Sequence, residues 1–295
     1  MRTVPTLLAI CFVIGLSPAL GQDKNIPIST QLTLNAAAPV QRPAINSVVL
    51  VHCKTTQMKG TGFALSDGTI ITAAHVLCGC NSNDVEAWTT SGTHVTFNKL
   101  ARDEDRDIAA LRPAQPLPGG LDLAPDETVQ ITERVNTWGF PLIYNGPAPI
   151  ISVGYVSGYY ETHPEVNACD VASADRDFKV RHIVVNGAFN PGNSGGPVFI
   201  FGQNKVVGLV IWKRIAFSDK VKTAVEGFQK PHGVQTLGNF SQQMPDGTWQ
   251  SISDQQMIGM VLEEFYNRVQ VDIGEAIAVS EVRAFLKNHA KELKD

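Results

Sequence analysis

Short apolar stretches, each bounded by turn residues, recur along the chain from residue 47 to residue 212. Val, Ile, Thr and aromatic residues are frequent in these stretches, and this composition at short spacing predicts β-strands. The predicted strands are Ser47–His52, Thr61–Leu65, Thr69–Ala73, Glu86–Thr90, His94–Leu100, Ile108–Arg112, Arg134–Trp138, Ile150–Tyr160, Phe178–Val185, Val198–Phe201 and Val206–Trp212. A Pro- and Gly-rich stretch at 113–125 divides them into two groups. This pattern predicts an all-β fold of two small barrels or sandwiches packed together.

The N-terminal end has a different pattern. Arg2 precedes the apolar run Leu7–Leu16, and small residues then lead to a cleavage site before Gln22. Residues 1–21 are therefore predicted to be a signal peptide, and its apolar run is too short to cross a bilayer. Residues 22–44 are polar and contain several prolines, which predicts an extended N-terminal arm. Since no other long apolar stretch follows, we expect an exported protein, periplasmic or secreted, without a membrane span.

The C-terminal part is more polar and more helix-prone than the centre. A Pro-Asp-Gly turn at 245–247 precedes a predicted helix that starts at Ser253 and carries apolar residues at helical spacing. A final predicted strand, Ile273–Val279, leads into a helix with Ser280 as its N-cap and an apolar face that includes Phe285.

Composition supports a packed domain and excludes some functions. The 295 residues are 43% hydrophobic and 18% charged, include 25 Gly and 17 Pro, and carry a formal charge of −4. This apolar content is enough for a sizeable core, which argues against overall disorder. Nucleic-acid binding usually requires a strongly basic surface, so no nucleic-acid partner is predicted.

Four cysteines follow the predicted signal peptide: Cys53, Cys78, Cys80 and Cys169. An even number of cysteines in an exported protein predicts disulfides. A bridge between Cys78 and Cys80 would close a very small, strained ring. We therefore expect Cys53 to pair with one of these two residues and Cys169 with the other, and both assignments stay open. A metal site formed by the Cys-Gly-Cys step and His52 would suit a reducing cytosol, so no metal is predicted.

Three segments contain the residue types of nucleophilic catalysis. A predicted strand leads to His75, Asp107 precedes an apolar run, and Ser194 lies in a glycine-rich loop. A serine hydroxyl needs a base to take its proton, and that base needs a carboxylate that fixes its tautomer and stabilises its charged form. His75, Asp107 and Ser194 thus form a candidate catalytic triad. The glycines allow a tight turn, and the backbone N–H groups of Gly192 and Ser194 are the expected oxyanion-hole donors.

Together these segments resemble the trypsin-like (chymotrypsin-fold) serine peptidases, with motifs most similar to the bacterial HtrA-type branch. The resemblance rests on Thr72-Ala73-Ala74-His75, Asp107-Ile108-Ala109-Ala110-Leu111 and Asn190-Pro191-Gly192-Asn193-Ser194-Gly195-Gly196-Pro197. It implies two packed six-stranded antiparallel β-barrels with a C-terminal helix, and an active site between the barrels that needs no cofactor. The implied peptidase domain is 45–290, with barrel one at 45–112, the linker at 113–125 and barrel two at 126–290.

The resemblance also assigns positions that bind substrate. It places Ala188 at the floor of the primary specificity pocket, and Ile211, Trp212 and Lys213 along the strand that pairs with the substrate backbone. Because Ala188 is uncharged, the resemblance implies a small or medium apolar residue at the cleaved bond, and not Lys or Arg. Lys213 stands where many relatives have Gly, and its side chain would narrow the pocket.

Three features depart from the family pattern. Asn193 stands where digestive members have the Asp that pairs with a newly cut N-terminus, so activation by that route is not expected. No PDZ domain is expected after the closing helix. Residues 214–270 replace a much shorter loop, and we expect this insertion to lie beside the specificity pocket, where it offers a site for a protein partner.

Two functions are consistent with these patterns. The first is an exported serine endopeptidase that hydrolyses polypeptides through a His-Asp-Ser triad and an acyl-enzyme intermediate. The alternative is a catalytically weak or latent protease fold that serves as a binding or chaperone-like module and is regulated by the 214–270 insertion.

Overall fold

The computed structural model describes most of the chain between residues 30 and 294. The described residues are 30–117, 120–125, 129–142, 144, 148–164, 168–169, 177–213, 240–243, 248–252, 258–259, 262 and 273–294. The predicted signal peptide at 1–21 and the predicted helix start at Ser253 therefore lie outside the described residues. So does most of the 214–270 insertion.

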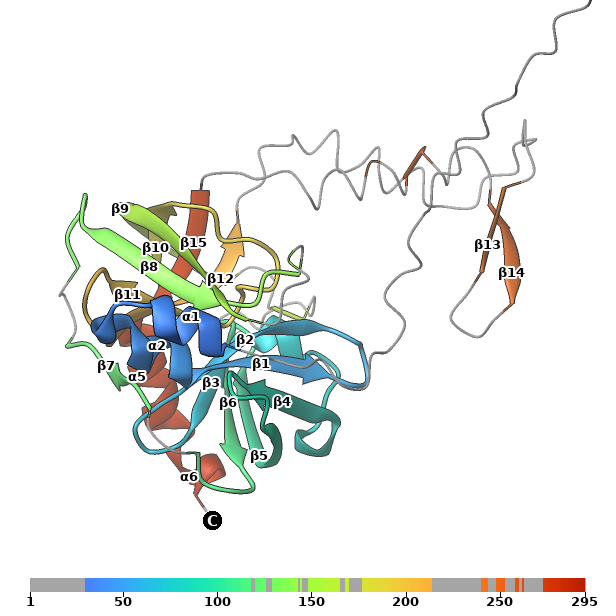
Figure 1. Ribbon diagram of the computed structural model, residues 1–295, viewed down its shortest axis with the longest axis horizontal. Helices are drawn as coiled ribbons and strands as arrows, with labels where there is room; N and C mark the ends of the chain where they lie inside the picture. The colour runs from blue at the N-terminus through green and yellow to red at the C-terminus, as the bar shows by residue number, and fades with distance from the viewer. Residues whose placement is uncertain are drawn as a thin grey trace, which may run out of the picture.

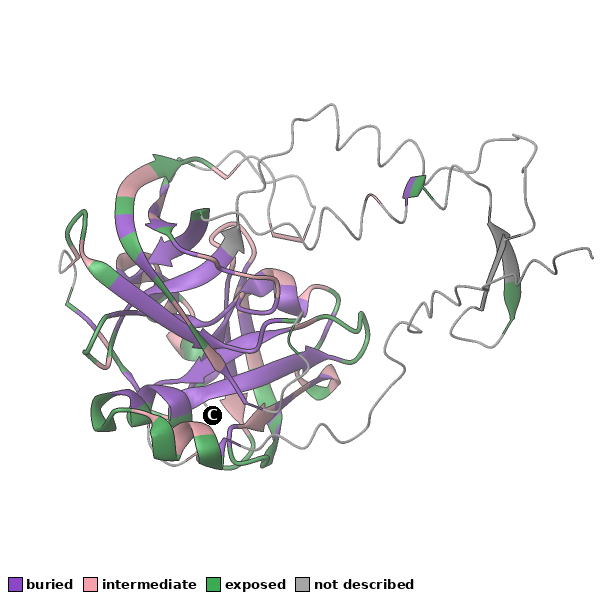
Figure 2. Ribbon diagram, turned by 45° about the horizontal axis from the view of Figure 1, so that its top comes forward, coloured by how far each residue is buried: buried purple, intermediate pink, exposed green. Residues whose placement is uncertain are grey.

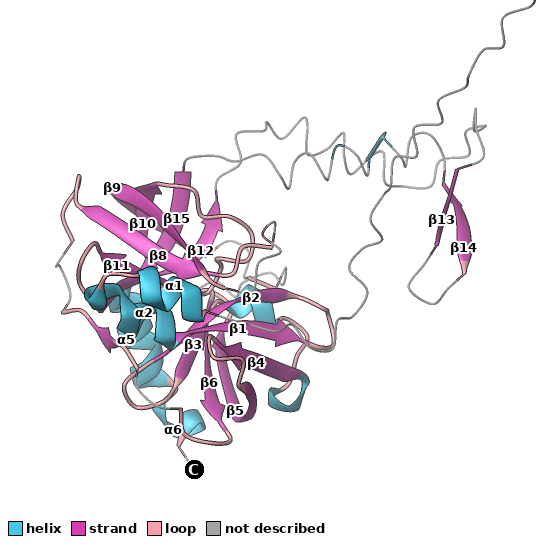
Figure 3. Ribbon diagram, in the orientation of Figure 1, coloured by secondary structure: helices cyan, strands magenta, loops and turns pink. Residues whose placement is uncertain are grey.

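The first group of predicted strands forms a closed antiparallel barrel (Figures 1 and 3). Its strands are β1 (Val48–Cys53), β2 (Lys59–Ala64), β3 (Ile70–Thr72), β4 (Val85–Thr89), β5 (His94–Asp103) and β6 (Ile108–Pro113), paired in the order β1-β2-β3-β6-β5-β4. At the β2–β3 turn, Gly68 has a φ of 83° and Asp67 accepts a hydrogen bond from the backbone N–H of Thr69 at 2.9 Å. This turn chemistry joins the predicted strands Thr61–Leu65 and Thr69–Ala73 as a hairpin.

The second group forms another closed barrel. Its strands are β8 (Arg134–Gly139), β9 (Ile150–Thr162), β10 (Val180–Asn186), β15 (Ile273–Ala278), β12 (Lys205–Lys213) and β11 (Pro197–Ile200), and a β11–β12 pairing closes the ring. A short strand from the predicted linker, β7 (Asp122–Leu123), pairs with β12 in parallel. The predicted fold of two six-stranded antiparallel barrels is confirmed.

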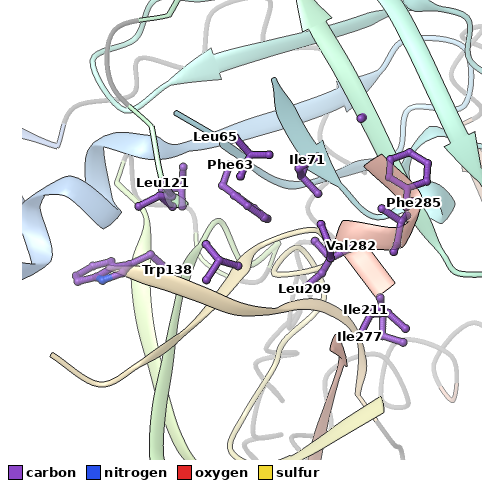
Figure 4. Close-up of a cluster of buried hydrophobic side chains, with 14 of the residues drawn as sticks. Phe63, Leu65, Ile71, Leu121, Trp138, Leu209, Ile211, Ile277, Val282 and Phe285 are labelled. Atoms are coloured by element: carbon purple, nitrogen blue, oxygen red, sulfur yellow. The ribbon is translucent and has the colours of Figure 1, made fainter. Parts of the chain in front are cut away.

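A shared apolar core joins the two barrels (Figure 4). Phe63 and Ile71 of barrel one belong to the same buried cluster as Leu209 and Ile277 of barrel two, and helix α5 (Val279–Asn288) adds Phe285. None of these five side chains is more than 1% exposed. Burying a large apolar side chain contributes about 1.5–3 kcal/mol, so this cluster fixes how the barrels and α5 pack.

Helix α5 begins two residues earlier than the sequence predicted. Ala278, with φ −65° and ψ 151°, is the N-cap residue and provides no side-chain cap. Ser280 lies inside the first turn, so the predicted cap at Ser280 is wrong. The chain passes directly from β15 into the helix because Val279 and Val282 are both buried, and this packing replaces a polar cap. A short helix, α6 (Ala290–Leu293), follows.

Short helices precede the first strand where an extended arm was predicted. They are α1 (Gln31–Ala36), η1 (Pro39–Gln41) and α2 (Arg42–Ser47). Ile45 in α2 is 0% exposed and joins the core between the barrels, and Gln41 Oε1 accepts a hydrogen bond from Trp138 Nε1 at 3.0 Å. The extended conformation predicted for 22–44 is thus wrong from residue 31 onward, because this segment buries apolar residues against the barrels. No residue of α1 is buried, whereas α2 buries Ala44 and Ile45, and Figure 2 shows exposed residues along these short helices.

Two disulfides connect the four cysteines, Cys53 with Cys80 and Cys78 with Cys169. This is one of the two pairings that the sequence left open. Cys78 directly follows η2 (Ala74–Leu77), and Cys169 lies in the connection between β9 and β10. The second bridge therefore joins barrel one to barrel two.

The described part of the 214–270 insertion contains an antiparallel hairpin, β13 (Phe240–Gln243) and β14 (Trp249–Ile252). The sequence did not predict these strands, whose residues are mostly polar, and the turn predicted at 245–247 lies outside the described residues. Among the described ranges, no helix has the length and apolar character needed to cross a membrane.

Candidate active site

Asp107 holds His75 by both of its carboxylate oxygens. His75 lies in η2, just after β3, and its backbone N–H donates to Asp107 Oδ1 at 2.8 Å. The ring atom Nδ1 lies 2.8 Å from Asp107 Oδ2. With Nδ1 donating to a carboxylate, the neutral ring leaves Nε2 free to accept a proton. The arrangement therefore orients His75 as a base.

The backbone of Asp107 explains how its side chain reaches His75. Asp107 has a φ of 55°, in the left-handed region that Asp tolerates better than most residues. Nearby Asp103 is instead bound by Arg106, whose Nη1 lies 2.7 Å from Asp103 Oδ2. The structure thus brings Asp107, the residue selected from the sequence, to His75, and leaves Asp103 in a separate ion pair.

The surroundings of His75 raise its pKa. Burial of the ring lowers the pKa, but the negative charge of Asp107 and the hydrogen bond to Asp107 raise it, and the net result lies above the ordinary value of 6.5. The His75 side chain is still 21% exposed. The charged form of His75 is thus stabilised by Asp107 in a place that solvent and substrate can reach.

Ser194 lies on a tight loop between β10 and β11. Gly192 and Gly195 have φ values of 97° and 85°, and a Cβ atom at these positions would collide with the Phe140 carbonyl and the Thr61 carbonyl, respectively. Only glycine fits both the backbone angles and the space. The sequence Gly-Asn-Ser-Gly therefore specifies this loop conformation.

The loop packs against the strand that leads to His75. The backbone N–H of Thr61 in β2 donates to the Ser194 carbonyl at 2.8 Å, and a Cβ on Gly195 would lie 2.7 Å from the backbone nitrogen of Ala73. Ser194 Oγ donates to the Ile211 carbonyl at 3.4 Å, and not to His75, within the part of the chain that the structure describes. Ser194 and His75 therefore lie on adjoining segments, with the hydroxyl turned toward β12.

Backbone hydrogen bonds leave two N–H groups of this loop unused. The carbonyls of residues 190–194 all accept hydrogen bonds. Three of the donors belong to other segments: Leu142 N binds the Pro191 carbonyl, and Thr61 Oγ1 and Thr61 N bind the carbonyls of Gly192 and Ser194. The other two lie within the loop, from Asn193 N to the Asn190 carbonyl and from Gly196 N to the Asn193 carbonyl. Asn193, Gly195 and Gly196 donate their N–H groups to backbone carbonyls. The N–H groups of Gly192 and Ser194 have no acceptor among the described residues. These are the two donors that the sequence assigned to the oxyanion hole.

The predicted specificity residues lie near this loop. Ala188 is half-buried, and Ile211 in β12 is 7% exposed. Trp212 and Lys213 are also in β12, but their side chains lie outside what the structure describes.

Sequence reasoning missed Phe189, the neighbour of Ala188. The Phe189 ring is 2% exposed and packs against Gly274 of β15, where an added Cβ would collide with the ring. The signal was available, since Phe189 is the only aromatic residue in the Gly-rich segment 186–197. The buried ring thus packs the segment that leads to Ser194 against β15.

The protein consists of two closed antiparallel barrels. One carries a His–Asp pair and the other a serine between glycines, and this arrangement is the one that defines trypsin-like serine peptidases. The chain belongs to the trypsin-like peptidase family. The family model described as "Trypsin-like peptidase domain" matches residues 60–209, half of the chain. The predicted family membership is confirmed.

Curated relatives fit the HtrA-type resemblance. The chain is 30% identical over 160 residues to a probable periplasmic serine endoprotease, DegP-like, from Halomonas elongata, which covers 54% of this chain and 30% of the relative. It is 30% identical over 155 residues to the putative serine protease HhoB from Synechocystis sp., which covers 52% of this chain and 34% of the relative. The chain thus spans about a third of the length of these relatives.

Solved structures share the fold. The Rv3671c protease from M. tuberculosis in its active form has a TM-score of 0.56 at 18% identity, over 87% of this chain and 86% of that one. The HtrA-type protease AlgW with a decapeptide has a TM-score of 0.53 at 14% identity, over 86% of this chain and 67% of that one.

Proposed function

We propose that this protein is an exported serine endopeptidase with Ser194 as nucleophile, His75 as base and Asp107 as the group that orients His75. The observation that carries the proposal is the double hydrogen bond from His75 to Asp107, at 2.8 Å for both the backbone and the ring. A structural histidine has no need of a carboxylate that fixes both its backbone and its tautomer.

In the proposed reaction, Ser194 Oγ attacks the carbonyl carbon of a peptide bond while its proton passes to His75 Nε2. The hydroxyl has to turn from the Ile211 carbonyl to His75 first, a small movement that substrate binding commonly brings about. The N–H groups of Gly192 and Ser194 then stabilise the negative oxygen. His75 returns its proton to the leaving amine, and water hydrolyses the acyl-enzyme with His75 again acting as base.

We further propose that the substrate backbone pairs with β12 and that the cleaved bond follows an uncharged small or medium apolar residue. The half-buried Ala188 and the buried ring of Phe189 support this preference, because neither offers a charge to a Lys or Arg side chain. A polypeptide in extended conformation is the ligand that a strand edge recognises.

Export is part of the same proposal. The signal-peptide pattern at 1–21 and the two disulfides support it, since structural disulfides persist mainly in oxidising compartments. The relative from Halomonas elongata is described as a probable periplasmic serine endoprotease, which agrees with this location. We propose cleavage before Gln22 and a peptidase domain at 45–290.

A fluorophosphonate probe, which reacts with activated serines, tests the catalytic proposal. The wild type should be labelled, Ser194→Ala should not, and His75→Ala and Asp107→Asn should be labelled at least about a thousandfold more slowly. Asp103→Asn is a matched control. Asp103 is paired with Arg106 and not with His75, so this substitution should change the labelling rate little. A wild type that stays unlabelled, or a Ser194→Ala variant labelled equally well, would refute the proposal.

A second candidate is a latent protease or binding module controlled by the 214–270 insertion. The observation that favours it is the Ser194 hydroxyl, which contacts Ile211 and not His75 in the described structure. The same probe separates the two candidates when it is applied to a variant in which a short Gly-Ser linker replaces 216–268. Labelling that appears only in this variant indicates latency, and equal labelling of both proteins contradicts it.

A further inference from the structure

The hydroxyl of Thr61 connects three segments of the protein at one buried point. Thr61 lies in β2 and is 0% exposed. Its Oγ1 donates to the Gly192 carbonyl at 2.6 Å and accepts a hydrogen bond from the backbone N–H of Phe140 at 3.0 Å. Its backbone N–H holds the Ser194 carbonyl at 2.8 Å. A residue of barrel one thus fixes two carbonyls of the loop that carries the nucleophile.

The contact to the Gly192 carbonyl matters because this carbonyl belongs to the peptide unit between the two unused N–H groups. The N–H groups of Gly192 and Ser194 belong to peptide units separated by a single unit, the one that joins Gly192 to Asn193. In a trans peptide the C=O and N–H point in opposite directions, and the described chain contains no cis peptide. The backbone angles at Gly192 and Asn193, on either side of the middle unit, set the relative orientation of the two N–H groups, so the placement of this unit decides how they converge. Its carbonyl is the one that the Thr61 hydroxyl holds.

This middle unit needs a restraint because glycine offers little of its own. Gly192, at φ 97°, can adopt many backbone conformations at low energetic cost. On one side, the Asn193 N–H donates to the Asn190 carbonyl at 2.9 Å, a contact within the loop itself. The Thr61 hydroxyl supplies the contact that fixes the loop against barrel one, where His75 and Asp107 lie.

We propose that Thr61 is a positioning residue: its hydroxyl fixes the Gly192–Asn193 peptide so that the N–H groups of Gly192 and Ser194 point at one oxyanion. The inference rests on the proposed peptidase function. Thr61 touches no reacting atom and acts only through the backbone of the loop. Loss of its hydroxyl removes two hydrogen bonds and leaves the Gly192 carbonyl and the Phe140 N–H buried without that partner, which favours a turned peptide.

The primary test replaces the hydroxyl while keeping the shape of the side chain. Thr61→Val should lower kcat on a peptide substrate at least about tenfold with KM within about twofold, because the oxyanion contacts strengthen in the transition state. Thr61→Ser should restore kcat to within about threefold of the wild type. Thr137→Val is the matched control: Thr137 is also 0% exposed, but its Oγ1 has no hydrogen-bond partner among the described residues, so kcat should not change.

A comparison of two ligands separates positioning from a general structural role. Ser194 Oγ adds to the carbonyl carbon of a peptide aldehyde, the Ser194 proton passes to His75 Nε2, and the former carbonyl oxygen takes the electron pair of the C=O π bond and occupies the oxyanion hole. Thr61→Val should lower the affinity for the aldehyde by the same factor by which it lowers kcat. The affinity for a non-reacting peptide, measured in the Ser194→Ala background, should not change. Equal losses for both ligands, or no loss for either, would overturn the proposal.

Two further measurements keep the test decisive. If Thr61→Val does not fold, Thr61→Ser is compared with Thr61→Ala, because both lack the methyl group and differ only in the hydroxyl. If the wild type fails to react with the fluorophosphonate, the peptidase proposal fails, and a crystal structure of Thr61→Val still tests the positioning. A Gly192 carbonyl that keeps its orientation there contradicts the role of Thr61, and a turned one supports it.

Discussion

At the scale of single residues, the His75–Asp107 contact determines the pH at which the proposed base is free. The pKa of His75 is raised by Asp107 by more than burial lowers it. We therefore expect kcat/KM to rise with pH along a limb centred above about 6.5. In Asp107→Asn the raising contributions disappear and burial remains, so this limb should move to lower pH while kcat falls about a thousandfold or more. A limb that does not move would show that a group other than His75 controls activity.

The same contact links stability to pH. A folded-state pKa above the unfolded value means that the pair contributes stability fully below the unfolded pKa, and that this contribution is lost as pH rises through the folded pKa. The stability difference between the wild type and Asp107→Asn should therefore be larger at pH 5.5 than at pH 9, measured by urea unfolding. A larger difference at pH 9 would contradict the direction of the shift.

Individual residues also show what sequence could and could not predict about the site. His75, Asp107 and Ser194 were identifiable because each sits in a short motif with its own chemical reason. The N–H groups of Gly192 and Ser194 were also assigned from the glycine-rich motif, but the contacts that hold their loop were not, because Thr61 supplies two of them from a distant strand. Phe189 stands out in the sequence as the only aromatic residue of 186–197, but its packing was missed because its contact, Gly274, lies far along the chain. Contacts between distant segments are not encoded in local patterns.

At the scale of elements, the strands of both barrels were predictable and the N-terminal helices were not. Alternation and turn residues specify strands locally, as at the Asp67–Gly68 turn. Residues 31–47 have weak periodicity, and their helices become visible only through tertiary contacts such as Ile45 in the core and Gln41 on Trp138. The polar hairpin β13–β14 was missed for the same reason, since its strands lack an apolar pattern.

The burial of α2 leads to a stability prediction. Ile45→Ala should lower the free energy of unfolding by about 2–5 kcal/mol, because the 0% exposed side chain leaves a cavity between the barrels. Leu32→Ala in α1 is the control, since Leu32 is 85% exposed and its truncation should change stability by less than about 0.5 kcal/mol. Chemical denaturation of both variants measures the difference. Equal, small effects would mean that the helices before β1 are not part of the folded core.

At the scale of the whole molecule, the Cys78–Cys169 disulfide restrains the two barrels across a sequence separation of 91 residues. Closing a loop of this length in the unfolded chain corresponds to about 4–5 kcal/mol in the chain-entropy model, so a Cys78→Ser, Cys169→Ser double variant should lose stability by up to that amount.

Activity of this double variant, at a temperature where it stays folded, should change little. Although Cys78 follows His75 closely, Asp107 holds His75 directly, and Arg102 Nη1 donates to the Leu77 carbonyl at 2.6 Å. The geometry of the proposed base is thus fixed within barrel one. Unfolding curves and kcat, measured on the same preparation, separate the two roles: a folded variant with a kcat reduced more than about tenfold would show that the bridge positions the site as well as stabilising the fold.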